Sequence, residues 1–305
     1  MKKELVIILL LSTVFLSGCA GSFAGILGGK NTAVYGKGVS IRFLPGNPPT
    51  NRILEGQEFK VFVELSNSGL TAVNGQLCVS DDKYANYGGI EEPKVCEQFS
   101  LAGADETDEA SPSSDKFYFP SYDGPGYIYR GIEGKNIDTT IIAEALYSGY
   151  RAIASPSIRL CTDSKECSFD ETISGSSLGG DAARAPVTVT SIHKTITPAG
   201  RNVGVVLEMN VENVGGGEIP SLTPNDDRQK VGFEINYEGS GIEFDCRPLS
   251  GGLIILNNNK ATIRCQSRNN VELETGVQEN PVQIYLTYDY LTKLPIEKIP
   301  LEDTD

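Results

Sequence analysis

"FKVFVELSNSG", residues 59–69, and "VVLEMNVENVG", residues 205–215, decide the fold, because both stretches place an apolar residue at every second position in the same register. A period of two is typical of a half-buried β-strand. Both stretches end in Asn-x-Gly, which favours a turn and supplies residues that tolerate positive φ. The matching apolar positions are Phe59, Val61, Val63 and Leu65 in the first stretch, and Val205, Leu207, Met209 and Val211 in the second.

A second pair of matching stretches lies later in each half of the chain. "TTIIAEALYSGY", residues 139–150, and "PVQIYLTYDY", residues 281–290, also alternate, and a Pro-bearing stretch follows each. The chain is therefore predicted to be a tandem repeat of one β-module. The alternating apolar residues are Ile141, Ala143, Ala145 and Tyr147, and then Val282, Ile284, Leu286 and Tyr288.

The rest of the chain is predicted to be all-β, with short strands at regular spacing that favour β-sandwiches. No amphipathic helix of ten residues or more is expected. We expect two sandwich domains, residues 38–173 and 187–301, joined by the Gly/Ser-rich linker "SGSSLGGDAARAP", residues 174–186. Further strands are expected at residues 39–43, 76–79, 95–101 and 116–119, and at 187–192, 230–237, 242–246 and 261–265.

The alternating strand that ends in Asn-x-Gly resembles the immunoglobulin-like modules called CARDB, a cell-adhesion-related domain of prokaryotic, including archaeal, surface proteins. The resemblance covers most of both halves. It implies two tandem immunoglobulin-like β-sandwiches and a role at the cell surface.

The N-terminus has the layout of a signal peptide, with Lys2 and Lys3 before an apolar run over residues 5–16. This run is shorter than the roughly 18 residues that a membrane-spanning helix needs. "LSGC", residues 16–19, resembles the lipobox of prokaryotic lipoproteins, which implies removal of residues 1–18 and a lipid anchor on Cys19. Residues 19–37 would then form a flexible tether. An ordinary cleaved signal peptide is the alternative.

Six cysteines remain beyond Cys19, and an even number in an exported chain favours disulfides. Six cysteines allow 15 pairings, and the two-domain division narrows them to pairs that are close in sequence. Free thiols or a metal site are the alternatives. The predicted pairs are Cys78 with Cys96, Cys161 with Cys167, and Cys246 with Cys265.

The net charge of −14 disfavours nucleic acid and anionic lipid headgroups as partners. We expect contact with the membrane through the lipid alone, and with other surface proteins or an envelope polymer. No cofactor or metal is expected, although calcium in the acidic loops at Asp81-Asp82, Glu91-Glu92, residues 105–109 and Asp226-Asp227 is an alternative to a solvated acidic face.

No catalytic constellation is found. His193 is the single histidine, and it lies in line with the inward residues of its strand only if no bulge intervenes. "GSSLG", residues 175–179, fits the G-x-S-x-G nucleophile pattern, but that pattern works on a strained turn from a strand into a helix, and here it falls in the expected linker. The chain is therefore expected not to be an enzyme.

The aromatic stretch "FYFPSYDGPGYIYR", residues 117–130, has no counterpart in the second half, where "KATIRCQSRNN" occupies the matching place. Loops on a rigid sandwich often carry binding, and Tyr is suited to recognition. Tyr118, Tyr122 and Tyr127 are therefore candidates for a partner contact, with a purely structural role as the alternative. The expected function is a lipid-anchored surface protein for adhesion, protein interaction or envelope structure. A glycan- or ligand-binding lipoprotein that serves a surface enzyme or transporter is the alternative.

Overall fold

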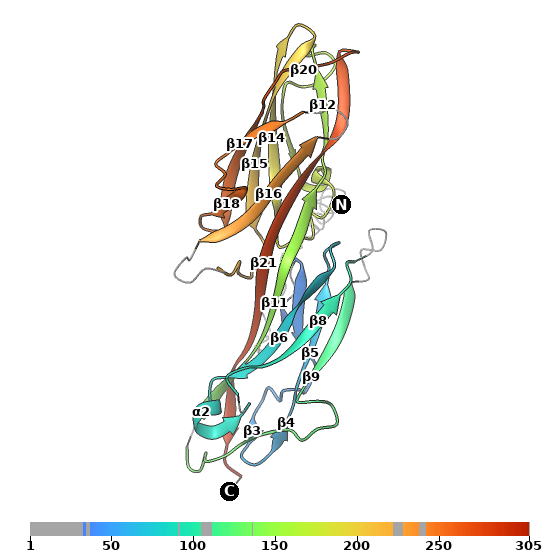
Figure 1. Ribbon diagram of the computed structural model, residues 1–305. Helices are drawn as coiled ribbons and strands as arrows, with labels where there is room; N and C mark the ends of the chain where they lie inside the picture. Colours follow the sequence, from blue (N-terminus) through green and yellow to red (C-terminus); the bar gives the residue numbers. More distant parts are fainter. Residues whose placement is uncertain are drawn as a thin grey trace, which may run out of the picture. The chain divides into compact units, whose positions relative to one another are not determined.

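The computed structural model describes residues 33–34, 37–90, 92–104, 112–135, 137–221, 228–237 and 242–304. These residues form an all-β fold of several antiparallel sheets (Figure 1). The described helical segments are short: α2 (Tyr84–Tyr87) and the 3-10 helix η1 (Gly175–Leu178). The predicted all-β class is confirmed.

The first half of the chain contributes a sheet with the strand order β1-β2-β5-β9 and a small sheet with the order β4-β10-β7. The strands of the larger sheet are β1 (Ala33–Val34), β2 (Val39–Phe43), β5 (Val61–Asn67) and β9 (Ser113–Phe119). Those of the smaller sheet are β4 (Glu58–Phe59), β10 (Tyr127–Tyr129) and β7 (Gly88–Gly89).

The second half contributes a sheet in which β14, β15 and β19 are paired in the same order as β2, β5 and β9. β15 and β5 are the two stretches that share the alternating pattern, and each lies between the two partners named here. The strands of this sheet are β13 (Asp170–Ser174), β14 (Val187–Ala199), β15 (Asn202–Asn213), β19 (Lys260–Ser267), β17 (Phe244–Arg247) and β20 (Val271–Glu272).

The largest sheet draws strands from both halves, in the order β18-β16-β21-β11-β6-β8. β12 and β3 also pair with β21, β12 in antiparallel and β3 in parallel orientation. Its strands are β18 (Leu253–Leu256), β16 (Gln229–Tyr237), β21 (Val277–Glu302), β11 (Ile137–Ala154), β6 (Val73–Asp81), β8 (Val95–Leu101), β12 (Ser157–Cys161) and β3 (Ile53–Leu54).

The two long strands β11 and β21 belong to both halves. Residues 282–287 of β21 pair with β16 of the second half, whereas its last residues, 301–302, pair with β3 of the first half. In between, β21 pairs with β11 from Ala154 to Ile137, and β11 pairs in turn with β6. One continuous sheet therefore contains strands from both sides of the predicted linker, residues 174–186.

The predicted alternation is confirmed by burial in all four repeated stretches. Each of the apolar residues that the sequence assigns to the inward face is at most 4% exposed. These residues contribute to one hydrophobic core cluster that includes residues from both halves. The inward faces could be predicted because every second residue of a strand lies on the same side of the sheet unless a bulge intervenes.

The expected linker, residues 174–186, is packed and does not run free between two bodies. Leu178, Ala182 and Ala185 are buried, and the Ser155 N–H donates to the Leu178 carbonyl at 2.8 Å. Gly180 has φ +56°, and an added Cβ there would lie 2.4 Å from the Ile153 carbonyl oxygen. The glycines and alanines of this segment thus allow close packing. The described residues from 33 to 304 belong to one compact unit.

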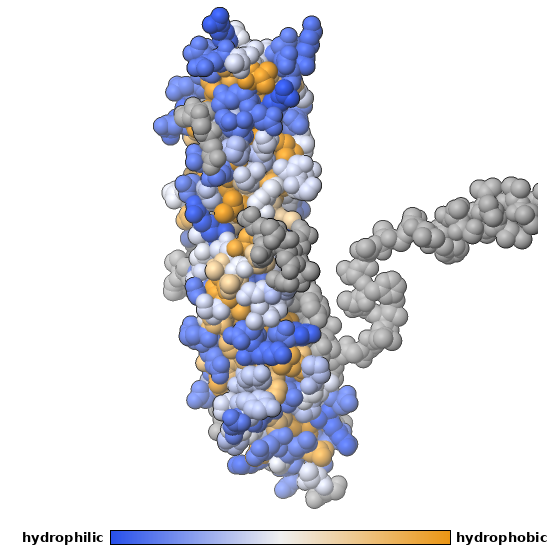
Figure 2. All heavy atoms as spheres, turned by 90° about the vertical axis from the view of Figure 1, so that its right-hand side faces the viewer, coloured by the Kyte–Doolittle hydropathy of each residue, from blue (hydrophilic) through white to orange (hydrophobic). Residues whose placement is uncertain are grey.

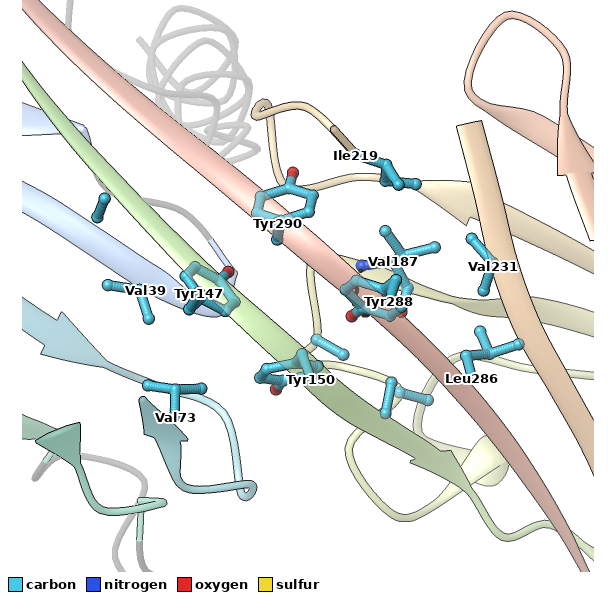
Figure 3. Close-up of a cluster of buried hydrophobic side chains, with 14 of the residues drawn as sticks. Val39, Val73, Tyr147, Tyr150, Val187, Ile219, Val231, Leu286, Tyr288 and Tyr290 are labelled. Atoms are coloured by element: carbon cyan, nitrogen blue, oxygen red, sulfur yellow. Dashed lines mark hydrogen bonds between the residues drawn. The ribbon is translucent and has the colours of Figure 1, made fainter. Parts of the chain in front are cut away.

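Four buried tyrosines lie where β11 and β21 pass from one half to the other (Figure 3). Tyr147 faces its register partner Tyr290 with ring centroids 5.8 Å apart, and Tyr150 faces Tyr288 at 5.4 Å. Burial raises the pKa of Tyr290 to about 12. The cluster fills the core at the shared part of the sheet.

Two of these tyrosines, Tyr150 and Tyr290, pack against the Asn-x-Gly turns at the ends of β5 and β15. In each turn the glycine N–H donates to the asparagine Oδ1, at 3.0 Å for Gly69 and at 3.3 Å for Gly215. A Cβ added to Gly69 would lie 2.0 Å from Tyr150 Oη, and one added to Gly215 would lie 2.5 Å from Tyr290 Oη. Neither glycine has positive φ. The expectation that these glycines serve a positive-φ turn is therefore wrong, and they serve the close approach of a tyrosine.

Candidate contact surface

The aromatic stretch at residues 117–130 supplies both core and surface. Phe117 and Phe119 on β9 and Tyr129 on β10 are buried, as the structural interpretation of this stretch predicts. Tyr122, in the turn between the two strands, is 63% exposed and is the most exposed of the large hydrophobic residues described. The stretch is thus divided by strand alternation into inward and outward aromatic residues.

An outward aromatic cluster forms from Phe62, Tyr118 and Tyr122. Phe62 on β5 is the register partner of Tyr118 on β9, and their ring centroids are 4.9 Å apart with an edge-on geometry. Tyr122 lies 5.3 Å from Tyr118 and 5.9 Å from Phe62. Lys60 Nζ donates to the Tyr122 carbonyl oxygen at 2.6 Å, which holds the turn to the residue just before β5.

Tyr127 lies apart from this cluster. Its register partner is Phe59, and the two ring centroids are 5.7 Å apart. Tyr127 is half-buried and packs against the hydrophobic core. Of the three tyrosines that the sequence singles out, the structure therefore brings Tyr118 and Tyr122 together and places Tyr127 elsewhere.

Phe62, the third ring of the cluster, was not among the residues predicted from the sequence. Its signal was available, because Phe62 occupies an outward position between the inward residues Val61 and Val63. An aromatic residue on the outward side of a strand has no core partner to explain it. On the face drawn in Figure 2, hydrophobic residues show in separate places among hydrophilic ones.

The outward side of β2, β5 and β9 is ordered into cross-strand rows by the strand registers. A row of hydroxyls and a row of charges lie beyond the aromatic cluster, at successive outward positions about 7 Å apart along the strands. The Arg42 guanidinium forms an ion pair with Glu64. The hydroxyl row is Ser40, Ser66 and Ser114, and the charged row is Arg42, Glu64 and Lys116.

Three disulfides join the pairs of cysteines that the sequence predicts. Cys78–Cys96 links β6 to the edge strand β8, and Cys246–Cys265 links β19 to the edge strand β17. Cys161–Cys167 closes the loop that follows β12. Disulfides persist in oxidising compartments, so the chain belongs to an extracytoplasmic environment.

His193 lies on the outward side of β14. A register irregularity between Val189 and Ser191 shifts the alternation, so that His193 leaves the line of inward residues. Its Nδ1 is 3.2 Å from Thr172 Oγ1, and its Nε2 is 3.5 Å from Asp170 Oδ1. These contacts hold an exposed imidazole at a strand surface, which agrees with a structural role.

The G-x-S-x-G pattern at residues 175–179 lies on η1, a 3-10 helix of four residues. A nucleophile turn needs a following helix that positions the serine, and η1 is too short for that role. The pattern is therefore a coincidence of a Gly/Ser-rich segment.

Two buried carboxylates, Asp81 and Asp181, belong to the scaffold. Asp81 accepts from Tyr129 Oη at 2.6 Å, and Asp181 accepts from Tyr150 Oη at 2.5 Å. Burial raises the pKa of each carboxyl above its ordinary value, although the tyrosine hydrogen bonds act in the opposite direction. At Asp82, burial is outweighed by hydrogen bonds from Lys83 and the Thr140 N–H, and the pKa is lowered.

Other candidate features do not assemble a second site. No group of three or more potential metal ligands occurs among the described residues. A hollow of about 750 Å³ is lined by residues such as Glu243, Glu272 and Glu274, and of these Glu243 is paired with Arg268. The acidic residues Glu91, 105–109 and Asp226-Asp227 lie outside the described part of the chain, as do Cys19 and the leader.

No helix in the part of the chain that the structure describes is long and apolar enough to span a membrane. Comparison with protein-family models finds no match, and comparison with curated proteins also finds none.

Proposed function

We propose that the chain is an exported, lipid-anchored, non-enzymatic surface protein that contacts another component of the cell envelope through Phe62, Tyr118 and Tyr122. The CARDB-like resemblance and the lipobox of the leader favour this interpretation. The disulfides support export. The anchor itself rests on the sequence around Cys19 alone.

One observation carries the contact function. Tyr122 is 63% exposed, yet its backbone is held by Lys60 and its ring packs beside two others. Tyrosine rings are frequent at recognition surfaces, because they present a large apolar area and a polar tip with few rotatable bonds. A cluster that is both exposed and held in place is suited to a partner contact.

A photo-crosslinking amino acid at position 122 tests the contact in the native envelope. We expect a discrete adduct that is lost when Tyr118→Ser is added, since the two rings form one surface. The same crosslinker at position 266, an exposed residue of β19 on the second half, is the matched control and should give no such adduct. Equal yields from both positions would show random collisions and contradict the proposal.

The anchor is tested separately with Cys19→Ser. The lipid-anchored protein should sediment with membranes, because two acyl chains give stable attachment where one does not. The variant should lose the lipid mass in intact-mass analysis and leave that fraction. An unchanged membrane fraction in the variant would contradict the anchor and leave the contact proposal standing.

A further inference from the structure

We infer that the outer edge of β9 binds an extended polypeptide segment of another protein, which joins the sheet as a further antiparallel strand. This inference rests on the proposed contact function and states how the partner of that surface is held. Tyr118 belongs to β9, so a segment on this edge lies beside the aromatic cluster.

β9 is an edge strand of seven residues that ends the sheet order β1-β2-β5-β9 (Figure 1). Within the described residues, no strand pairs with its other side, and its register with β5 contains no bulge. The edge strands β13, β17 and β18 of the second half span only four or five residues. Short strands and bulges protect an edge from pairing with another chain, whereas a long edge without them can accept a strand.

The direction of the main-chain groups follows from the pairing of β5. Phe62 bonds away from β9, because its carbonyl accepts from the Leu44 N–H, which follows β2, at 2.8 Å. Successive residues of a strand direct their main-chain groups to alternate sides, so the odd-numbered residues of β5 bond to β9, and their register partners are odd-numbered as well. The even-numbered residues of β9 therefore direct their N–H and C=O groups to the open edge. These residues are Ser114, Lys116 and Tyr118.

One of these edge groups is covered by a local side chain. The Lys116 N–H donates to the Asp115 carboxylate at 2.8 Å, which agrees with an N–H that the ladder with β5 does not use. Charged side chains on an edge strand limit its pairing with other chains. An added strand has to displace this carboxylate, so Asp115 makes the edge more selective.

The second half already holds a strand in the equivalent position. Glu208 is equivalent to Phe62, and its register partner Arg264 is therefore equivalent to Tyr118. β17 pairs with β19 over residues 264–267 in antiparallel orientation, and a disulfide joins the two strands. The repeated module thus accepts a strand along this edge, and in the first half no described residues fill that place.

A second copy of β9 is a poor occupant of the edge. Of the three antiparallel alignments that overlap most, one places Lys116 opposite itself and another places Asp115 opposite itself, and like charges directly opposite are destabilising. The third, centred on Phe117, sets Ser114 against Pro120, which has no N–H to donate. A strand from a different protein carries none of these restrictions.

The side chains at the edge select the sequence of the segment. Glu64, the register partner of Lys116, is already ion-paired with a residue of β2, so a carboxylate on the added strand has a cation to meet at Lys116. Phe117 lies at the rim of the core, with its ring centroid 6.4 Å from that of Phe99 on β8, which favours an apolar residue opposite it. An aromatic residue opposite Tyr118 extends the outward cluster. In its own direction the antiparallel segment therefore runs aromatic, apolar, acidic.

The first test measures binding of the full chain in detergent to the capped peptide Thr-Tyr-Val-Glu-Thr-Thr. In the expected register the Glu of the peptide lies opposite Lys116, and its N–H points to β9. N-methylation of that Glu should weaken binding by at least about tenfold, because a main-chain bond is lost and its acceptor is left unpaired. N-methylation of the Val, whose N–H points away from β9, is the matched control and should stay within about threefold.

Variants of the protein test the same edge from the other side. Lys116→Pro removes an edge N–H and spares the bonds to β5, and proline is compatible with an edge strand when its nitrogen faces outward. It should weaken peptide binding by at least about tenfold, whereas Lys116→Ala, which keeps the N–H, should lose less than about fivefold. Asp115→Ala uncovers the Lys116 N–H and should strengthen binding. Thr262→Pro, at the equivalent position of β19, should change nothing.

In the native envelope, Lys116→Pro should also reduce the adduct from the crosslinker at position 122 by at least about tenfold, and Lys116→Ala should not. Equal binding of the two N-methylated peptides would overturn the inference, and this comparison decides the matter if Lys116→Pro lowers the melting temperature. A dimer of the parent chain that Lys116→Pro dissociates would assign the edge to a second copy instead. An adduct that contains no polypeptide, or one that persists in a stably folded Lys116→Pro protein, would refute this inference alone, while the absence of any adduct would refute the proposed function as well.

Discussion

Ile296→Ala tests whether the last strand of the chain stabilises the first half of the protein. Ile296 is fully buried on β21, its register partner is Ile141 on β11, and Ile141 pairs in turn with Asp81 on β6. Two tandem domains with a boundary at residues 174–186 would confine the effect of this substitution to the second half. The shared sheet instead predicts that the first half is weakened.

The magnitude follows from the loss of a buried aliphatic side chain. Truncation of a fully buried isoleucine to alanine costs about 2–5 kcal/mol, which combines lost transfer free energy with a cavity term. Domains are stable by only about 5–15 kcal/mol, so a large share of the stability is removed. An opening free energy lowered by 2 kcal/mol accelerates amide exchange by about 30-fold, at 1.4 kcal/mol for each factor of ten.

Native-state hydrogen exchange with peptide-level mass spectrometry measures this change in the opening free energy. We expect faster exchange in peptides from β6 and β8, which lie in the first half and about 200 residues before Ile296 in sequence. Urea unfolding should show a lower midpoint in a single transition. Glu297→Ala, at the exposed neighbouring position, is the matched control and should stay within about 0.5 kcal/mol of the parent protein.

Unchanged protection of β6 and β8 in a clearly destabilised Ile296→Ala protein would refute the argument. Such a result would mean that the two halves open independently and that the pairing of β11 with β21 adds little. The division into residues 38–173 and 187–301 would then describe the folding units after all.

Two further predictions concern the disulfides and the buried carboxylates. Replacing Cys78 and Cys96 with serine removes a cross-link with a sequence separation of 18 and should cost about 3 kcal/mol in urea unfolding. Equal stability of the variant and the oxidised parent protein would contradict this prediction. Asp181→Asn should flatten the pH dependence of stability, because burial raises the pKa of Asp181 in the folded state above its unfolded value. The folded state then binds the proton more tightly, so stability of the parent falls as pH rises from the unfolded pKa through the folded pKa, and urea unfolding between pH 4 and pH 8 should show that slope in the parent and a smaller one in the variant.

The strands could be predicted from the sequence because their alternation is strict. Val39–Phe43 and Val95–Leu101 were expected with the bounds that β2 and β8 have, and the cysteine pairs followed from their closeness in the chain. These are local properties, since a strand's period fixes its inward side and a short loop limits which cysteines can meet.

The sharing of strands could not be predicted in this way. The sequence matches β11 with β21 because both have the same alternating pattern. That similarity does not tell whether the two strands pair with each other. Their mutual register from Ala154 to Ile137 is a long-range property, set by which edges the two modules leave open. The close packing of residues 174–186 could not be predicted either, because glycine and alanine are compatible both with a flexible linker and with a packed segment.

The aromatic cluster is a second feature that could not be predicted from the sequence. Phe62 and Tyr118 are far apart in sequence and become one cluster only through the register of β5 with β9. In the second half the position equivalent to Phe62 is Glu208, and the register of β15 with β19 brings it beside Arg264 instead. Since the inward faces of both halves must pack one shared core, they are constrained alike, whereas the outward faces are free to differ. Such a division of constraint permits a contact function confined to the first half. The second half then completes the largest sheet, which shares one hydrophobic core with the sheet that carries that surface.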